Sequence, residues 1–183
     1  MHRSTHDYLT GLPNRRLFEQ NLLEAIDNNK KNLVAVLFLD FNNFKHINDQ
    51  QGHRFGYLVL VQIAARLTKG IRITDLAARL GGDEFVVLAP GFTDAQEIKN
   101  FVEKVLKIFQ KPLKIGKKTI RITVSIGVAI YPTDANKASQ LLHYSDVALY
   151  EAKKMSVISI GFIIKFNSSL ILKKLALVKK SFQ

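Results

Sequence analysis

The chain contains no cysteine, which excludes a disulfide scaffold, thiolate catalysis and cysteine-ligated zinc or iron–sulfur sites. Long apolar runs are also missing. No uncharged stretch approaches the ~18 residues that a membrane-spanning helix needs, and residues 1–12 contain no signal-peptide core. Internal repeats, proline-rich linkers and low-complexity segments are absent too. We therefore expect a single globular domain, soluble and cytoplasmic.

Acidic residues are scarce, since 15 Asp and Glu face 27 Lys and Arg and leave a net charge of +12. Residues 155–183 hold five lysines and no acid, so +5 of this excess lies in the tail. The other basic residues are scattered and form no RNA-binding or helix-turn-helix pattern. We expect no nucleic-acid partner, and an anionic small substrate such as a nucleotide fits the excess equally well.

The first part of the chain alternates between helical and strand patterns, which favours an α/β fold. Asn14 is a candidate cap for a helix that ends at residues 28–30 and whose apolar positions are Phe18, Leu22, Ala25 and Ile26. Residues 33–39 are apolar throughout, as is typical of a strand buried on both faces. This strand ends at Asp40, so a carboxylate lies at its carboxyl end.

A hairpin is predicted in the middle of the chain. After an irregular stretch, a helix with its apolar face over residues 60–67 ends at Gly70. Residues 76–80 and 83–89 then form two strands, joined by Gly81–Gly82 as a two-residue turn, because glycines supply the positive φ angles such turns need. The hairpin tip carries Asp83 and Glu84.

The last part contains two helices and one strand. Thr93 and Gln96 fit a capping box for a helix through Phe109. From Ile120 to Ile130 every second residue is Ile or Val, which predicts one strand. A final helix has Leu141, Ser145, Ala148, Leu149 and Ala152 on one face.

Three acidic residues, Asp40, Asp83 and Glu84, suggest chemistry if the first strand and the hairpin are neighbours. Their carboxylates would converge at one sheet edge and offer the oxygen ligands that Mg²⁺ prefers, in an arrangement suited to phosphoryl transfer. Lys45 could add positive charge where a phosphate develops negative charge. The alternative is that the acids are ordinary turn residues and Lys45 a solvated lysine.

Several separated segments carry a family resemblance. Residues 79–85 (RLGGDEF) are similar to the signature of GGDEF domains, the diguanylate cyclases. Residues 7–15 (DYLTGLPNR), 40–53 (DFNNFKHINDQQGH) and 145–154 (SDVALYEAKK) resemble other family segments in the same order. The resemblance covers a domain within residues 1–154. It implies a nucleotidyl-cyclase or palm-like α+β sandwich, with a central, mainly antiparallel sheet flanked by helices and the strand at 33–40 in the middle.

The resemblance also implies the roles of site residues. Asp40, Asp83 and the backbone carbonyl of Phe41 would hold Mg²⁺ or Mn²⁺. Asp83, Glu84 and Lys45 would be catalytic, with the Asp83 carboxylate as base. Substrate contacts are implied for Gly81, Gly82, Asn48 at the guanine edge, His53, and Lys153 at the triphosphate. Each of the last three residues also has an alternative interpretation without a functional role. Asn48 could cap a turn, His53 could be an ordinary loop histidine, and Lys153 could be a solvated cation at a helix end.

The reaction implied is condensation of two GTP molecules into cyclic di-GMP and two pyrophosphates by a homodimer. Arg72 and Asp75 (RITD) match an inhibitory site at which many such enzymes bind their product. Arginine grips phosphate or stacks on guanine, and aspartate accepts hydrogen bonds from a guanine edge. The alternative for this pair is an i,i+3 ion pair at a helix end. A second functional class is a catalytically impaired domain that binds GTP or cyclic di-GMP in signalling.

The sequence departs from the family pattern at three places. Tyr57 stands where a guanine-contacting aspartate is usual, and Asn42 replaces a frequent second aspartate. After Lys154 the family continues with a Gly-Arg-Asn segment and a final strand, but Val157 lies near the place of its triphosphate-binding arginine. Residues 155–183 resemble an out-of-register coding sequence and suggest a disordered or improvised tail. Alternatively, a basic amphipathic helix starts at Ser169 and favours an anionic membrane surface.

Overall fold

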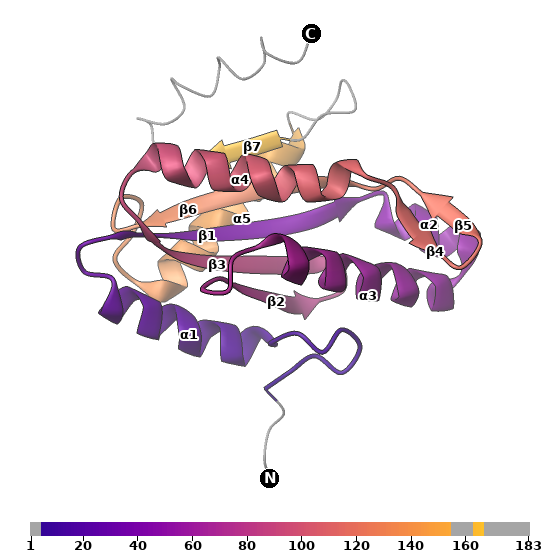
Figure 1. Cartoon of the computed structure of the whole chain (residues 1–183), viewed down its shortest axis with the longest axis horizontal. Coiled ribbons are helices and arrows are strands. Elements are labelled where there is room, and N and C mark those ends of the chain that lie inside the picture. Colours follow the sequence, from indigo (N-terminus) through magenta and orange to yellow (C-terminus); the bar gives the residue numbers. More distant parts are fainter. Residues whose placement is uncertain (1–4, 155–162, 167–183) are drawn as a thin grey trace, which may run out of the picture.

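The computed structural model describes residues 5–154 and 163–166 (Figure 1). Its helices are α1 (Arg15–Asn28), α2 (Phe44–Gln51), α3 (His53–Gly70), α4 (Ala95–Gln110) and α5 (Ala138–Lys154). Its strands are β1 (Leu33–Asn42), β2 (Leu76–Gly81), β3 (Glu84–Phe92), β4 (Leu113–Ile115), β5 (Lys118–Ile120), β6 (Thr123–Tyr131) and β7 (Ile163–Phe166).

The main sheet has the strand order β2-β3-β1-β6-β7, and β4 pairs with β5 separately. The pairs β2–β3, β1–β3 and β1–β6 are antiparallel, and β6–β7 is parallel. The expected mainly antiparallel sheet with the 33–40 strand at its centre is thereby confirmed. Residues 163–166 of the tail add a strand to the sheet edge, so the tail is not wholly separate from the domain. The helix from Ser169, which was the alternative to a disordered or improvised tail, and the position of Val157 lie outside the described residues.

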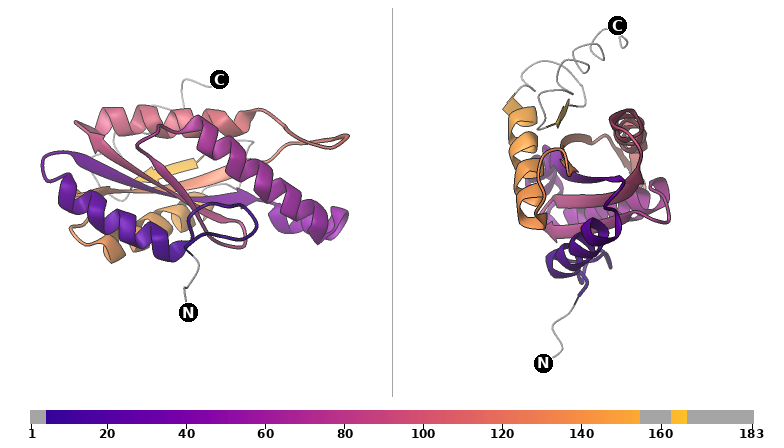
Figure 2. Two further views of the ribbon diagram at one scale, coloured as in Figure 1. Left: turned by 60° about the horizontal axis from the view of Figure 1, so that its bottom comes forward. Right: turned by 90° about the vertical axis from the view of Figure 1, so that its left-hand side faces the viewer.

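The sheet lies between two helical layers (Figure 2). Alternate residues of β1 point to opposite faces. Val34, Val36 and Phe38 pack in a cluster with residues of α1 and α5, and the intervening apolar residues pack with α3 and α4. This explains why residues 33–39 are apolar without a break, since a strand covered on both sides has no solvent face. Asp40 follows on the α1 and α5 side.

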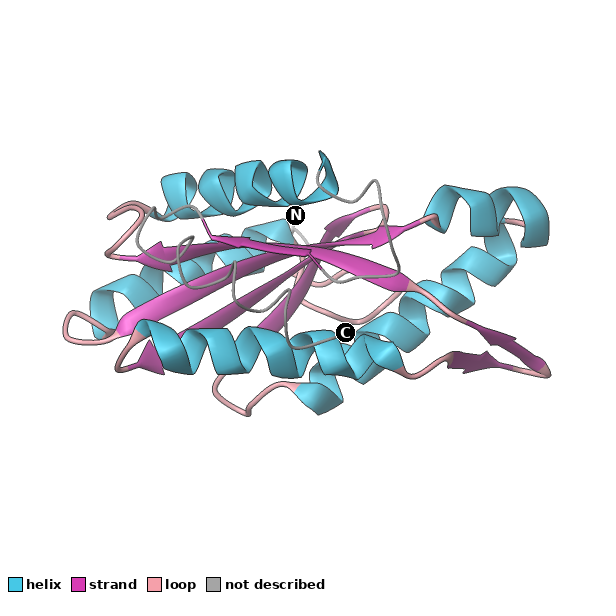
Figure 3. Ribbon diagram, turned by 90° about the horizontal axis from the view of Figure 1, so that it is seen from above, coloured by secondary structure: helices cyan, strands magenta, loops and turns pink. Residues whose placement is uncertain are grey.

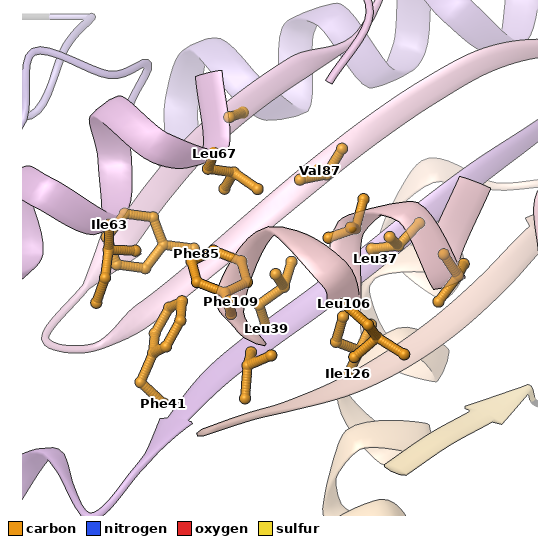
Figure 4. Packing of buried hydrophobic residues seen from close by; sticks show 14 of the residues in the cluster. Leu37, Leu39, Phe41, Ile63, Leu67, Phe85, Val87, Leu106, Phe109 and Ile126 are labelled. Atoms are coloured by element: carbon orange, nitrogen blue, oxygen red, sulfur yellow. The ribbon is translucent and has the colours of Figure 1, made fainter. Parts of the chain in front are cut away.

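Phenylalanines close the core beneath the acidic end of the sheet (Figure 4). The ring of Phe41 lies edge-on to Phe85, with centroids 5.6 Å apart, and to Phe109, with centroids 5.1 Å apart. All three side chains are buried. Edge-to-face pairs of this kind add about 0.5–1.5 kcal/mol beyond area burial, so β1, β3 and α4 hold each other in place just below Asp40.

Helix α2 occupies part of the stretch expected to be irregular. It follows Asn43, whose φ is 62°, and has no side-chain cap. Its one fully buried residue is Phe44, and it packs against α3. This short polar segment is helical because of tertiary packing, which its weak periodicity did not indicate.

The N-terminal cap of α4 and the limits of one strand also differ from the predictions. Asp94, not Thr93, caps α4, and its carboxylate accepts from the Glu97 amide at 2.9 Å. The alternation from Ile120 to Ile130 spans two strands, because the chain leaves the β4–β5 hairpin at residues 121–122 and enters β6. This hairpin extends beyond the main sheet at the end of the molecule where α2 also lies (Figure 3). None of the described helices has the length and apolarity to span a membrane.

Candidate active site

Three carboxylates lie at one end of the sheet. Asp40 and Glu84 are directly opposite each other in the β1–β3 pair. Opposed side chains share one face, with Cβ atoms about 4.5–5.5 Å apart. Asp83 precedes Glu84, in the tight turn between β2 and β3. The turn comprises Gly82 and Asp83, one residue later than the expected Gly81–Gly82, because Gly81 already pairs with Glu84.

Glycine is required in this turn for its conformation. Gly81 has a φ of 152° and Gly82 a φ of 49°, a region that residues with a side chain rarely adopt. A Cβ atom on either glycine would meet nothing within 4 Å, so space does not limit the choice. The glycines therefore allow the chain to reverse immediately before Asp83 and Glu84.

Lys153, on the last turn of α5, contacts this acidic group directly. Its Nζ lies 2.7 Å from Asp40 Oδ1. Burial raises the pKa of Asp40, the hydrogen bond and charge of Lys153 oppose this shift, and the charge of Asp83 adds to it. Burial also raises the pKa of Glu84, with a further contribution from the charge of Asp146 on α5. The ionised carboxylates of Asp40 and Glu84 are therefore less favourable in the folded protein than in water.

Oxygen-rich sites of this kind suit hard divalent cations. Mg²⁺ commonly takes one or two carboxylates and completes its shell with water and substrate phosphates. Asp40 with Glu84 or Asp83, and the Phe41 carbonyl, are the residues that would contribute. Within the described residues, no three His, Asp or Glu side chains form a ready metal-ligand group. The donor chemistry therefore fits a cation shared with a substrate phosphate.

Asn48, on α2, has an unusual environment. Its Oδ1 is buried and has no hydrogen-bond partner. It packs against Gly56 of α3 so closely that a Cβ atom on Gly56 would lie 1.9 Å from it. A buried polar atom without a partner is costly, so the position of this oxygen against Gly56 destabilises the fold locally. Tyr57 is next to Gly56 and 48% exposed.

The other expected substrate residues are solvent-exposed. Lys45 lies on the first turn of α2, and His53 is the first residue of α3. Asn42 is held by β6, because its amide donates to Thr123 Oγ1 and its oxygen accepts from the Ser125 hydroxyl, both at 3.1 Å. A surface hollow of about 540 Å³ between α1 and the start of α5 involves none of these residues.

Arg72 and Asp75 are paired with each other. The Arg72 Nη2 atom lies 2.7 Å from Asp75 Oδ1, and the Arg72 backbone amide donates to Asp75 Oδ2 at 2.7 Å. The Asp75 side chain is fully enclosed, whereas that of Arg72 is 36% exposed. The Arg72 guanidinium also lies 4.3 Å from the centroid of the Phe92 ring. The structure thus shows the i,i+3 ion pair that was the alternative to a ligand site.

Sequence reasoning gave no role to Arg79 and Asp7, although both lie in motifs that resemble the family. Arg79 Nη1 donates to both carboxylate oxygens of Asp7 at 2.9 Å, and its Nε and Nη2 donate to the Gly82 carbonyl. This contact joins residues 72 positions apart. The one sequence feature that could have indicated this contact is the position of Arg79, three residues before the turn.

Comparison with known proteins identifies the family of this chain. The sequence profile described as diguanylate cyclase, GGDEF domain, matches residues 4–156. The chain is 40% identical over 158 residues to the diguanylate cyclase TpbB of Pseudomonas aeruginosa, covering 85% of this chain and 36% of TpbB. It is also 35% identical over 151 residues to the cyclic di-GMP phosphodiesterase NbdA of the same species, covering 81% of this chain and 19% of NbdA.

Solved structures show the same fold. The isolated GGDEF domain of TpbB superimposes with a TM-score of 0.82 at 37% identity, covering 93% of this chain and 99% of that one. The GGDEF domain of DgcB from Caulobacter crescentus, solved in complex with cyclic di-GMP, gives 0.78 at 26% identity, covering 92% and 99%. The chain belongs to the GGDEF domain family. It spans about a third of the length of TpbB and about a fifth of that of NbdA.

Proposed function

We propose that this chain is a diguanylate cyclase that condenses two GTP molecules into cyclic di-GMP and two pyrophosphates. The observation that carries the proposal is the group of carboxylates at the sheet end, where Asp40 and Glu84 are opposed, Asp83 lies in the adjacent turn and Lys153 contacts Asp40. Positions and order of these residues agree with the motifs of the family. Because the substrate is a nucleoside triphosphate, we assign the reaction to the cytoplasm.

In the proposed reaction, the 3′-hydroxyl of one GTP attacks the α-phosphate of the other. The new bond joins the 3′-oxygen to phosphorus, pyrophosphate leaves, and the hydroxyl proton passes to the Asp83 carboxylate. The reciprocal attack by the 3′-hydroxyl of the second GTP closes the ring and releases the second pyrophosphate. A bound Mg²⁺ or Mn²⁺, held by Asp40 and Glu84 or Asp83 with the Phe41 carbonyl, would neutralise charge on the phosphates. Lys45 and Lys153 would bind phosphate oxygens, with Lys153 exchanging Asp40 for the triphosphate.

The guanine base is assigned to the α2–α3 end of the site. In this assignment the Asn48 side chain turns its oxygen away from Gly56 to accept from a guanine N–H, and His53, at the start of α3, contacts the substrate. Gly81 and Gly82 leave the hairpin tip open to the nucleotide. Each domain would hold one GTP, so the two reacting groups belong to different copies and catalysis needs a homodimer.

A second candidate function is a binding module without turnover. The specific observation in its favour is Tyr57, which brings bulk and one hydroxyl where a carboxylate would accept two guanine hydrogen bonds. In either function Arg72 and Asp75 are the proposed product site. Since Asp75 is enclosed, Arg72 is the member accessible to cyclic di-GMP, and binding through both residues would require their ion pair to open.

The test is incubation of concentrated protein with GTP and Mg²⁺ or Mn²⁺, followed by chromatography for cyclic di-GMP. Asp83→Ala should abolish product, and Tyr57→Asp together with a tail restored to Gly-Arg-Asn should increase it. Glu19→Ala, on the exposed side of α1, serves as the control variant. If wild type and the repaired variants all form no product while cyclic di-GMP still binds, the module is the correct function.

A further inference from the structure

Arg79, in β2, makes contacts on two sides of its guanidinium. On one side Nη1 lies 2.9 Å from both Asp7 oxygens. On the other, Nε and Nη2 donate to the same acceptor, the Gly82 carbonyl, at 3.0 and 2.8 Å. The side chain is only 9% exposed, and that of Asp7 only 14%. Arg79 therefore links Asp7 rigidly to the turn that carries Asp83.

Asp7 is itself fixed within the opening loop, residues 5–14. Its carboxylate accepts from the amide and hydroxyl of Thr10 at 2.9 and 2.6 Å. Burial acts to raise the pKa of Asp7, but the hydrogen bonds from Thr10 and Arg79 together hold it below its ordinary value of 3.8. The Arg79 amide also donates to the Pro13 carbonyl at 3.0 Å. The loop therefore holds both the backbone and the side chain of Arg79.

We propose that Arg79 is a positioning residue for the reaction and that the opening loop sets the geometry of the catalytic turn through it. The inference rests on the proposed cyclase activity. Strand pairing places Glu84 opposite Asp40, but the consecutive glycines leave the turn itself permissive, so a further restraint is needed to fix Asp83. Two charge-assisted hydrogen bonds to the Gly82 carbonyl supply that restraint. Arg79 acts through the backbone and touches no reacting atom.

The chain offers a matched control in Arg66. Its guanidinium also donates to backbone carbonyls, those of Ile108, Lys111 and Pro112, which lie at the end of α4 and in the segment leading to β4. Arg66→Lys and Arg79→Lys each keep a positive charge but replace a planar fork by a single ammonium group. Both variants lose arginine–carbonyl contacts, but only one loses them at the turn.

The experiment measures kcat and KM for GTP, thermal stability, and deuterium exchange of the peptide covering residues 79–86. Because displacements near 1 Å cost about 100-fold in rate, we expect Arg79→Lys to lower kcat by about 10- to 100-fold. Its KM should stay within about twofold of wild type, and exchange at the turn should increase. Arg66→Lys should change stability without altering kcat or exchange at the turn. Asp7→Asn should also lower kcat, but by a smaller factor than Arg79→Lys.

The outcomes separate this inference from the proposed function. If wild type forms no cyclic di-GMP, the proposed function fails, and exchange at the turn still decides whether Arg79 restrains it. Unchanged exchange and unchanged kcat in Arg79→Lys would overturn the inference. The inference would also be overturned if kcat fell in proportion to the loss of thermal stability in both Arg79→Lys and Arg66→Lys, because Arg79 would then have only a structural role.

Discussion

At Gly127 of β6 the backbone of α5 lies directly against the sheet, and replacement of this glycine by alanine gives a sharp test of the fold. A Cβ atom there would lie 2.1 Å from the Ser145 carbonyl oxygen and 2.2 Å from the Leu149 nitrogen. Ordinary carbon–oxygen contacts are about 3.3–3.6 Å, so α5 must move away by about 1 Å. Both clashing atoms are backbone, and no side-chain rotation relieves them.

The expected cost follows from overpacking, which destabilises by about 1–3 kcal/mol and occasionally more. We place Gly127→Ala near the upper end, with a loss of about 2–3 kcal/mol and a fall in Tm of about 4–12 °C. Gly70→Ala is the matched control: its Cβ atom would meet Ile108 Cδ1 at 2.2 Å and Cγ1 at 2.6 Å, but both atoms belong to a side chain that can rotate away. We expect Gly70→Ala to stay within about 0.5 kcal/mol of wild type.

Urea unfolding followed by circular dichroism, with both midpoints and slopes compared, measures these changes. The backbone movement also shifts α5, so the Lys153 contact with Asp40 should weaken and GTP turnover should fall further than stability alone requires. Gly127→Ala unfolding at the wild-type midpoint would refute the reasoning. Equal losses of stability in Gly127→Ala and Gly70→Ala would also refute it, because a clash with backbone atoms would then cost no more than a clash with a side chain.

Two further predictions concern charge. Glu84→Gln should raise stability at pH 7 by about 0.2–1 kcal/mol, because like charges opposed across strands repel, while abolishing product. The pKa of Glu84 is raised in the folded state, so the stability of the wild type falls as pH rises from 4.5 through that raised pKa. Urea midpoints at pH 4 and pH 7 should show that Glu84→Gln loses less stability over this range than the wild type. Equal losses of stability in the two proteins would contradict this. Arg72→Ala should lower cyclic di-GMP affinity in calorimetry at least tenfold, whereas exposed Thr74→Ala should not; equal affinities would remove Arg72 from the product site.

Elements with long, uniform patterns could be predicted from the sequence. Asn14 caps α1 as expected, with its side chain accepting from Leu17 N at 3.2 Å, and β1 is the buried central strand. Local patterns failed where two readings were equally good. Thr93 with Gln96 and Asp94 with Glu97 both fit a capping pattern, and in the structure Asp94 is the cap.

In the candidate site, too, residues with a strong local sequence signal could be predicted and contacts between distant residues could not. Asp40 and the hairpin acids were identifiable because strand ends and tight turns leave strong local signals. The contact of Arg79 with Asp7 and the enclosure of Asn48 by Gly56 depend on pairs distant in sequence or on neighbouring helices, and no local spacing encodes them. Arg72 and Asp75 show the limit of motif matching, because one spacing serves both an ion pair and a ligand site.

One departure from the family pattern, Tyr57, lies at the proposed base end of the site, and this location decides how its replacement should affect activity. Tyr57 is on α3 beside Gly56, whereas the carboxylates and Lys153 at the sheet end match the family pattern. Lost base contacts act equally on bound substrate and transition state, so they raise KM and leave kcat nearly unchanged. Tyr57→Asp should then lower KM for GTP by at least about tenfold, because even one hydrogen bond to a charged group is worth about 1.5–3 kcal/mol.

Rates of cyclic di-GMP formation across a wide GTP range, for wild type and Tyr57→Asp, measure this directly, with Leu58→Ala as the exposed neighbouring control on α3. In an enzyme with a weakened base site, the two rate curves converge at saturating GTP because the carboxylate end is shared. A binding module gives no product from wild type at any GTP concentration. A Tyr57→Asp variant that raises kcat while leaving KM unchanged would show that Tyr57 disturbs the reacting groups themselves, contrary to its place at the base end.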